Sequence, residues 1–113
     1  MPHVPPPNSA IAELAEALGE ESAHELVEMF LTSFDAVLRD LNAGDREQRK
    51  RAAHSLKSSA RIVGAGVLSN RMAELEARLT NTTGDITHDD ITATIEEFER
   101  IAVALRAYAR QTG

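Results

Sequence analysis

His54 is the residue whose type and surroundings could do chemistry, because basic and hydroxyl side chains recur around it at helical spacing. At about 100° per residue, one helical face carries His54 together with Lys50, Arg51, Lys57, Ser58 and Arg61. The opposite face carries small or apolar residues that suit burial, namely Ala52, Leu56, Ser59 and Val63. An imidazole in this position is open to a partner, and the positive charge around it suits it to hold an anion.

Two apolar-periodic segments precede this helix. The first is short, running from Ile11 to Leu18, and Gly19 ends it, as glycine often does just beyond a helix. The second is predicted to begin with a capping box of Ser22 and Glu25, in which each side chain satisfies the other's backbone N–H. Its apolar stripe comprises Leu26, Val27, Phe30, Leu31, Phe34, Val37, Leu38 and Leu41.

The helix that carries the histidine is predicted to begin at a cap made by Asp45 and Gln48 and to end near Gly64. Because the turn that follows is very short, we expect this helix and the next to pack as antiparallel neighbours. The next helix has an apolar stripe of Leu68, Met72, Leu75 and Leu79. The last helix is predicted to be capped by Asp85 or Thr87. Its predicted buried residues are Ile91, Ile95, Phe98, Ile101, Ala102, Leu105 and Tyr108.

These five segments predict an all-α fold, since no strand pattern competes with them. Four long amphipathic helices with short connections favour an up-down four-helix bundle, with an additional short N-terminal helix. A chain of 113 residues has the length of one domain. We expect residues 1–8 to form a flexible, proline-rich tail and residues 9–113 to form the bundle domain.

Composition and charge exclude several classes of protein. The chain has no cysteine, so it forms no disulfide and offers no thiolate. No apolar run approaches the roughly 20 residues that span a bilayer, and the N-terminus lacks the regions of a signal peptide, so we expect a cytoplasmic protein. The formal net charge of −6 argues against general nucleic-acid binding. Residues 45–71 nevertheless carry a net charge of +5, which favours one particular acidic partner.

The remaining histidines form no recognisable site. His3, His24 and His88 show no spacing typical of a metal site, so we expect them to be surface residues and expect no metal or cofactor in this chain. A glycine-rich loop of the kind that binds ATP phosphates is also missing from the sequence. The chain leaves no room for an ATP-binding domain, so we expect no autokinase activity.

The stretch around the histidine also matches a family pattern. The pattern Ala-His-x-Leu-Lys-Gly-small-small-x-x-x-Gly-Ala is followed from Ala53 to Ala65, and further matches occur at Leu68 and at Leu75-Glu76. Ser58 departs from it, since the family usually has glycine there. On these residues the chain resembles the histidine phosphotransfer (HPt) domain of bacterial phosphorelays, from the first predicted helix to the last.

The resemblance implies that His54 is the phosphoacceptor of a phosphoryl carrier that is not itself an enzyme. It also implies two partners, the receiver domains of response regulators and of a hybrid histidine kinase, with Mg²⁺ expected only in the partner. Lys57, one helical turn away, is expected to stabilise the phosphoryl charge. The residues expected to contact the partner's acidic pocket are Lys50, Arg51, Ser58 and Arg61. We expect the carrier to be a monomer.

Two other functions stay open from the sequence. In the first, a similar bundle binds a kinase or receiver domain without accepting phosphate, because the Ser58 side chain beside the imidazole obstructs close docking. In the second, the chain is a structural bundle that self-associates through an exposed apolar stripe. Acid-labile, base-stable label after incubation with a phosphorylated receiver would distinguish a phosphoryl carrier from an interaction module that accepts no phosphate. Sedimentation at several concentrations would distinguish a monomeric carrier from a self-associating bundle.

Overall fold

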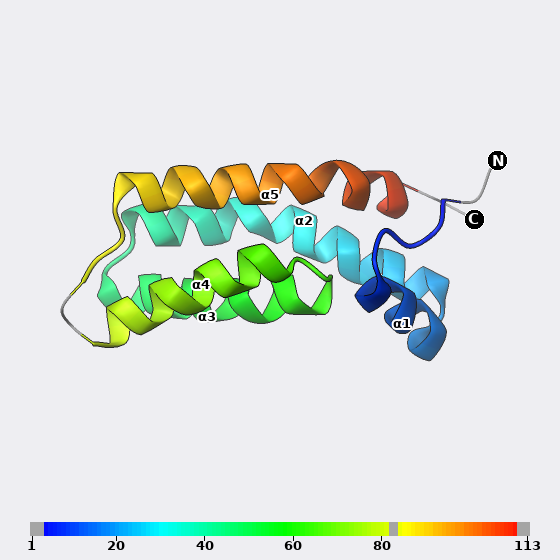
Figure 1. The fold of residues 1–113 in the computed structure, drawn as a ribbon, viewed down its shortest axis with the longest axis horizontal. Helices are drawn as coiled ribbons and strands as arrows, with labels where there is room; N and C mark the ends of the chain where they lie inside the picture. Colours follow the sequence, from blue (N-terminus) through cyan, green and yellow to red (C-terminus); the bar gives the residue numbers. More distant parts are fainter. Residues whose placement is uncertain (1–3, 82–83, 111–113) are drawn as a thin grey trace.

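The computed structural model describes residues 4–81 and 84–110. Within these ranges the chain forms no strand and five helices: α1 (Ser9–Leu18), α2 (Glu20–Ala43), α3 (Arg46–Ile62), α4 (Gly66–Thr80) and α5 (His88–Ala109). Helices α2 to α5 form an elongated up-down bundle, and α1 lies across one end of it (Figure 1). The predicted all-α bundle with an additional short N-terminal helix is therefore confirmed.

Helix α1 is capped by Asn8 at its N-terminal end and terminated by Gly19 at its C-terminal end. The Asn8 side chain accepts a hydrogen bond from the backbone N–H of Ile11 at 2.9 Å and donates one to the carbonyl of Val63, also at 2.9 Å. A Cβ added to Gly64 would lie only 2.4 Å from this side chain, so the two residues pack in direct contact. Gly19 ends the helix, as predicted, with a φ of +91°, a conformation that only glycine adopts readily.

Helix α2 begins earlier than the sequence predicts. It begins at Glu20, directly after Gly19, and has no side-chain cap. Ser22 therefore lies inside the first turn, and the predicted capping box of Ser22 and Glu25 is wrong. The first turn instead carries the carboxylates of Glu20 and Glu21, which interact favourably with the positive end of the helix dipole.

Capping boxes do open α3 and α5. The Asp45 side chain accepts from the backbone N–H of Gln48 at 2.9 Å, and the Gln48 side chain accepts from that of Asp45 at 2.8 Å, as predicted. Of the two predicted caps for the last helix, Asp85 and Thr87, the structure has Thr87, which pairs reciprocally with Asp90. These boxes fix where the two helices begin.

The bundle core lies between α2, α3, α4 and α5, with α1 closing one end. The predicted stripe of α4 is buried throughout: Leu68, Met72, Leu75 and Leu79. The rings of Phe34 and Phe98 stack with 3.7 Å between their centroids, which joins α2 to α5. On α3, Leu56 is the largest side chain in this core and is 2% exposed. One predicted core residue, Ile95, is instead 38% exposed. The neighbouring Thr94 is fully buried instead, and its hydroxyl is satisfied there because it donates to a backbone carbonyl of its own helix at 2.8 Å.

A two-bond ion pair ties α4 to the start of α5. The Arg78 guanidinium donates to both carboxylate oxygens of Asp90, at 2.8 and 2.9 Å. These hydrogen bonds lower the pKa of Asp90 from 3.8 to about 2, and they prevail over the opposing effect of burial. The pair is therefore charged throughout the neutral range.

We expect Asp90→Asn to remove part of the protein's sensitivity to acid. Because the pKa of Asp90 is lower in the folded chain than in the unfolded chain, its pairing stabilises the fold above about pH 4 and is lost as the pH falls toward about 2. The variant should lose about 1–2 kcal/mol of unfolding free energy at pH 7 and much less at pH 2.5. Urea unfolding of both proteins at the two pH values tests this. A difference that stays constant with pH would contradict it.

Candidate functional site

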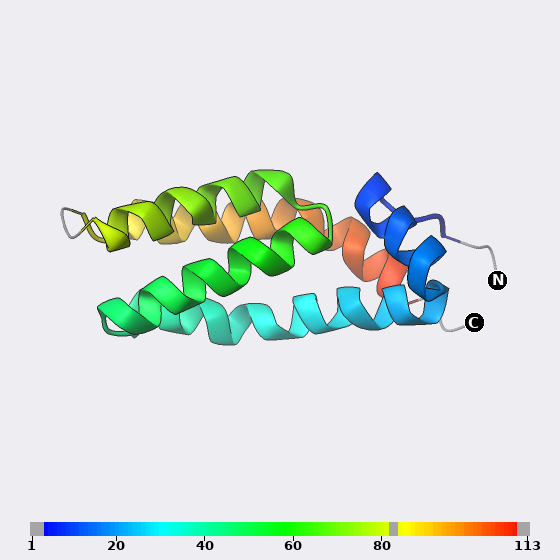
Figure 2. The same ribbon diagram turned by 90° about the horizontal axis from the view of Figure 1, so that it is seen from below.

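His54 stands on the solvent side of α3, near the middle of the helix. Its side chain is 63% exposed, whereas Ala52, Leu56 and Val63 on the opposite side are buried. The predicted division of this helix into a buried face and an exposed face is therefore confirmed at these positions, whereas Ser59, also assigned to the buried face, is half-buried. Figure 2 shows α3 between α2 and α4, so the histidine-bearing helix has one neighbouring helix on each side.

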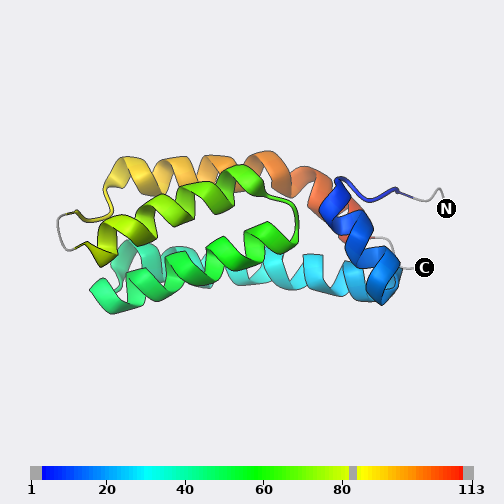
Figure 3. The same ribbon diagram turned by 60° about the horizontal axis from the view of Figure 1, so that its bottom comes forward.

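The short turn after α3 determines which residues of α4 lie beside His54. Gly64, with a φ of +80°, allows the chain to reverse at once, and α4 returns antiparallel to α3 (Figure 3). The register of the two helices is held by Ser69, which is buried on α4 and donates to the carbonyl of Lys57 at 2.9 Å. In this register Glu76 of α4 lies beside His54.

Glu76 joins the two residues that the sequence singles out for chemistry. One carboxylate oxygen lies 2.7 Å from Nδ1 of His54, and the other lies 2.5 Å from Nζ of Lys57. A carboxylate can only accept a hydrogen bond, so Nδ1 carries the proton. In the neutral ring the lone pair is then left on Nε2, which makes Nε2 the nucleophilic atom.

The charge of Glu76 is held in place by its partners. The hydrogen bond from Lys57 is the main cause that lowers the pKa of Glu76 below its usual 4.5, and the contact with His54 acts in the same direction. Partial burial opposes both effects but is outweighed. Glu76 is therefore ionised at neutral pH and remains an acceptor for the imidazole and the ammonium group together.

The four residues predicted to contact a partner surround this network. Arg51, Ser58 and Arg61 are exposed, and Lys50 is half-buried. Within residues 4–81 and 84–110, the charged groups of Lys50, Arg51 and Arg61 take part in no ion pair. Their contact with a partner stays a prediction, but their charges are available for it.

Two other arginines of the same segment are used by the fold. Arg46 donates to the carbonyls of Arg78 and Leu79 at the end of α4, at 3.2 and 2.9 Å. Arg49 pairs with Asp85 at 2.6 Å. The positive charge offered to a partner is therefore smaller than the sequence alone shows, and it is concentrated near the histidine.

Glu76 is the site residue to which the sequence assigned no role. It belongs to the family pattern, but its contact with His54 crosses from one helix to another. A signal was present: His54 precedes Gly64 by ten residues and Glu76 follows it by twelve. Residues at similar distances from a tight helical turn lie side by side in an antiparallel pair.

The part of the chain that the structure describes shows neither of two other kinds of functional feature, namely a cluster of metal ligands and a membrane-spanning helix. It contains no group of three or more His, Asp or Glu side chains placed to hold a metal ion. None of its helices is long and apolar enough to cross a bilayer. His24, predicted to be a surface residue, is half-buried and packs edge-on against Tyr108 with 4.3 Å between ring centroids. His88 is exposed, as predicted, and His3 lies outside the described residues.

Comparison with known proteins identifies the family of the chain. Residues 25–109 match the Hpt domain family, a range that includes α3, α4 and the three network residues. The sensor protein TorS of Escherichia coli (strain K12) is 30% identical over 95 residues, which cover 80% of this chain and 10% of that protein. The chain thus spans about a tenth of the length of this relative. No solved structure was found to match. With its helical bundle and its exposed histidine on α3, the chain belongs to the Hpt domain family, whose members carry phosphoryl groups in phosphorelays.

Proposed function

We propose that the chain carries a phosphoryl group on Nε2 of His54 between aspartates of receiver domains, from a hybrid histidine kinase to a response regulator. The contact between Nδ1 and Glu76 supports this most directly, because it prepares Nε2 for attack on an electrophile that arrives from solvent. The similarity to part of a sensor protein supports a place in a sensory pathway. The carrier acts as a monomer in this proposal.

The phosphoryl transfer step requires no proton donor or acceptor. The lone pair of Nε2 attacks the phosphorus of the partner's aspartyl phosphate, and the phosphorus–oxygen bond breaks as the nitrogen–phosphorus bond forms. Aspartate leaves as a carboxylate. The proton stays on Nδ1, which remains hydrogen-bonded to Glu76. The phosphorylated ring is then a cation beside an ionised carboxylate. Protonated Nδ1 also makes the ring a good leaving group, so the same contact serves the reverse transfer.

Lys57 has two roles in this proposal. At rest its ammonium group pairs with Glu76 at 2.5 Å. It also lies one helical turn from His54, within reach of a phosphoryl group on that side chain. Since phosphoryl transfer depends mainly on alignment and charge stabilisation, a cation at this place lowers the barrier while the partner's acidic pocket provides the alignment.

We expect Lys57→Ala to slow transfer from a phosphorylated receiver by about 5–30-fold, because one charge-assisted contact with the phosphoryl group is lost. Rapid-quench measurement of label on the protein gives the rate. Arg39→Ala is the matched control, since it removes one exposed positive charge from α2, outside the residues predicted to contact the partner. If Arg39→Ala slows transfer as much as Lys57→Ala, the effect is one of net charge, and the assigned role of Lys57 is wrong.

We expect Glu76→Ala to slow transfer by about 10–100-fold and Glu76→Gln to slow it less, because the amide oxygen still accepts from Nδ1. Nitrogen-15 NMR of the imidazole provides a readout that loss of packing would not change. Wild type and Glu76→Gln should hold the proton on Nδ1, whereas Glu76→Ala should show a mixture of tautomers. The same tautomer in all three proteins would contradict the positioning role of Glu76.

The proposed function is tested by incubation with a receiver domain that carries phosphate on its aspartate. Label on this chain that is lost in acid and stable in base, with a phosphoimidazole signal in phosphorus-31 NMR, supports the carrier. Label that then moves to a second receiver supports the shuttle. Stable binding of the receiver without label would favour the alternative, an interaction module that accepts no phosphate.

A further inference from the structure

Two hydrogen-bonded contacts join α4 to α3 at opposite ends of the helix pair. Near the turn between the helices, the buried Ser69 hydroxyl donates to the carbonyl of Lys57 at 2.9 Å. At the far end, the Arg46 guanidinium donates to the carbonyls of Arg78 and Leu79, at 3.2 and 2.9 Å. In each contact a side chain of one helix bonds to the backbone of the other, so the two contacts resist a shift of α4 along α3 from both ends.

The network around the histidine lies between these two contacts. Glu76 follows Ser69 by seven residues, which is two turns of α4, so both side chains face α3. On α3, His54 lies between Arg46 and Lys57. Glu76 contacts Nδ1 of His54 and Nζ of Lys57 together. A shift of α4 by one residue, about 1.5 Å, would move the carboxylate toward one of these donors and away from the other.

The apolar contacts of α3 define this register only weakly. Three of the four residues buried within the helix are alanines, namely Ala52, Ala53 and Ala60. Such short side chains let two helices approach closely, but they interlock less than large side chains do. Ser69 adds a preference for one register, because its buried hydroxyl would lose its partner in any other, and an unpaired buried hydroxyl is costly.

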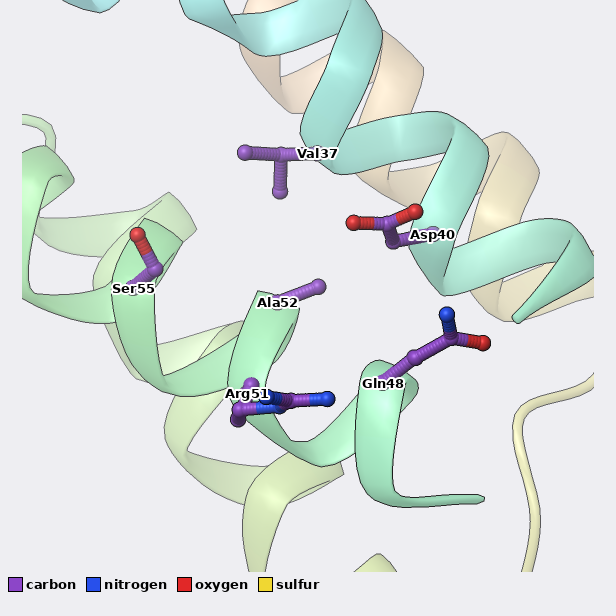
Figure 4. Close-up of a pocket in the computed structure, with 6 residues that line it drawn as sticks. All are labelled: Val37, Asp40, Gln48, Arg51, Ala52 and Ser55. Carbon is purple, nitrogen blue, oxygen red and sulfur yellow. The ribbon is translucent and has the colours of Figure 1, made fainter. Parts of the chain in front are cut away.

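The α2 flank of α3 offers less restraint near the histidine. A pocket of about 390 Å³ lies between the two helices there, and its lining includes Val37 and Asp40 on α2 and Ala52 and Ser55 on α3 (Figure 4). Within residues 4–81 and 84–110, the side chains that line this pocket form no hydrogen bond with the opposite helix. Polar restraint on this part of α3 therefore comes from α4.

We propose that Ser69 and Arg46 are positioning residues for phosphoryl transfer, because they hold α4 in the register in which Glu76 accepts from Nδ1 of His54. The inference rests on the function proposed above. Neither residue touches the reacting atoms. Both act through Glu76, which keeps the proton on Nδ1 and the lone pair on Nε2. Arg46 thus contributes to the reaction from within the helix pair rather than at the surface of the partner.

The effect on chemistry is measured with phosphoramidate, a small donor that transfers its phosphoryl group to the imidazole and releases ammonia, so that docking plays no part. Ser69→Ala and Arg46→Ala should each slow labelling of His54 by about 3–10-fold, the rate equivalent of one hydrogen bond. Nitrogen-15 NMR of the neutral imidazole should show a second tautomer in both variants, at a lower fraction than in Glu76→Ala. Wild-type rates and a single tautomer in both variants would overturn the inference.

Two control variants separate the register from stability and from charge. Thr94→Val removes another buried hydroxyl, whose hydrogen bond stays within α5. Arg39→Ala removes an exposed positive charge from α2. Both should keep the proton on Nδ1 and the rate within about twofold of wild type. Urea unfolding gives the stability of each variant. A control that slows labelling as much as Ser69→Ala or Arg46→Ala would overturn the inference.

A double-mutant cycle tests whether the two residues act through Glu76. In the Glu76→Ala background, Ser69→Ala and Arg46→Ala should slow labelling by less than about twofold, because the contact that they position is already absent. The same loss in both backgrounds would overturn the route through Glu76. If wild-type His54 takes label neither from phosphoramidate nor from a phosphorylated receiver, the proposed function itself is wrong. If it takes label and both variants keep the wild-type tautomer, only the positioning roles of Ser69 and Arg46 are wrong.

Discussion

His54→Gln is expected to take up no phosphoryl group from any phosphorylated receiver, while its helical content and melting temperature stay nearly unchanged. The loss is complete because an amide has no nucleophilic nitrogen lone pair. The fold is spared because the imidazole is 63% exposed and packs against little. The amide of the new side chain can still donate to Glu76, which keeps the neighbouring ion pair in place. Radiolabel from the receiver, together with circular dichroism, measures both effects.

His88→Gln is the matched control for this prediction. His88 is also an exposed histidine, at the first position of α5, and has no contact with the network around Glu76. This variant should be labelled as fast as wild type. Label that persists in His54→Gln, or that moves to His24 or His88, would show that the phosphoacceptor has been assigned to the wrong residue.

Leu56→Ala is expected to lower the free energy of unfolding by about 2–5 kcal/mol, the usual range for a large-to-small change in a packed core. Leu56 is 2% exposed and belongs to the hydrophobic cluster shared by all five helices. It lies on the side of α3 opposite the histidine, so this experiment also tests how the helix is turned.

Urea unfolding measures the loss, and Ile62→Ala provides the comparison on the same helix. Ile62 is 50% exposed, so its truncation should cost less than about 1 kcal/mol. A similar cost at both positions would mean that α3 presents a different face to the core. In that case the assignment of His54 to the exposed face of α3 would be wrong, and so would the proposed site.

Features that depend on one helix alone were predictable from the sequence. Periodicity within α3 placed His54 outside and Leu56 inside, because both positions follow from 3.6 residues per turn. The capping box of Asp45 and Gln48 was also predictable, since its two residues are neighbours in the chain. The local pattern failed at Ser22, because the preceding helix ends at Gly19 and the next begins at once.

Features that depend on how helices meet were not predictable in the same way. The contact of Glu76 with His54 depends on the register of α3 and α4, which the buried Ser69 helps to fix. Whether Thr94 or Ile95 is buried depends on the rotation of α5 against its neighbours. Hydrophobicity favours isoleucine at a buried position, but a threonine whose hydroxyl is bonded within its own helix is buried at small cost.

The two hydrogen bonds of Asn8 link two segments that are distant in the sequence. The same side chain contacts the start of α1 at Ile11 and the end of α3 at Val63, so displacement of Asn8 breaks a hydrogen bond to each segment. In hydrogen exchange, the backbone amides of Ile11 and Ala65 should therefore lose protection as one cooperative unit. Asn8 lies outside residues 25–109, the range that matches the family. The end of the histidine-bearing helix thus owes part of its protection to a residue that the family pattern does not include.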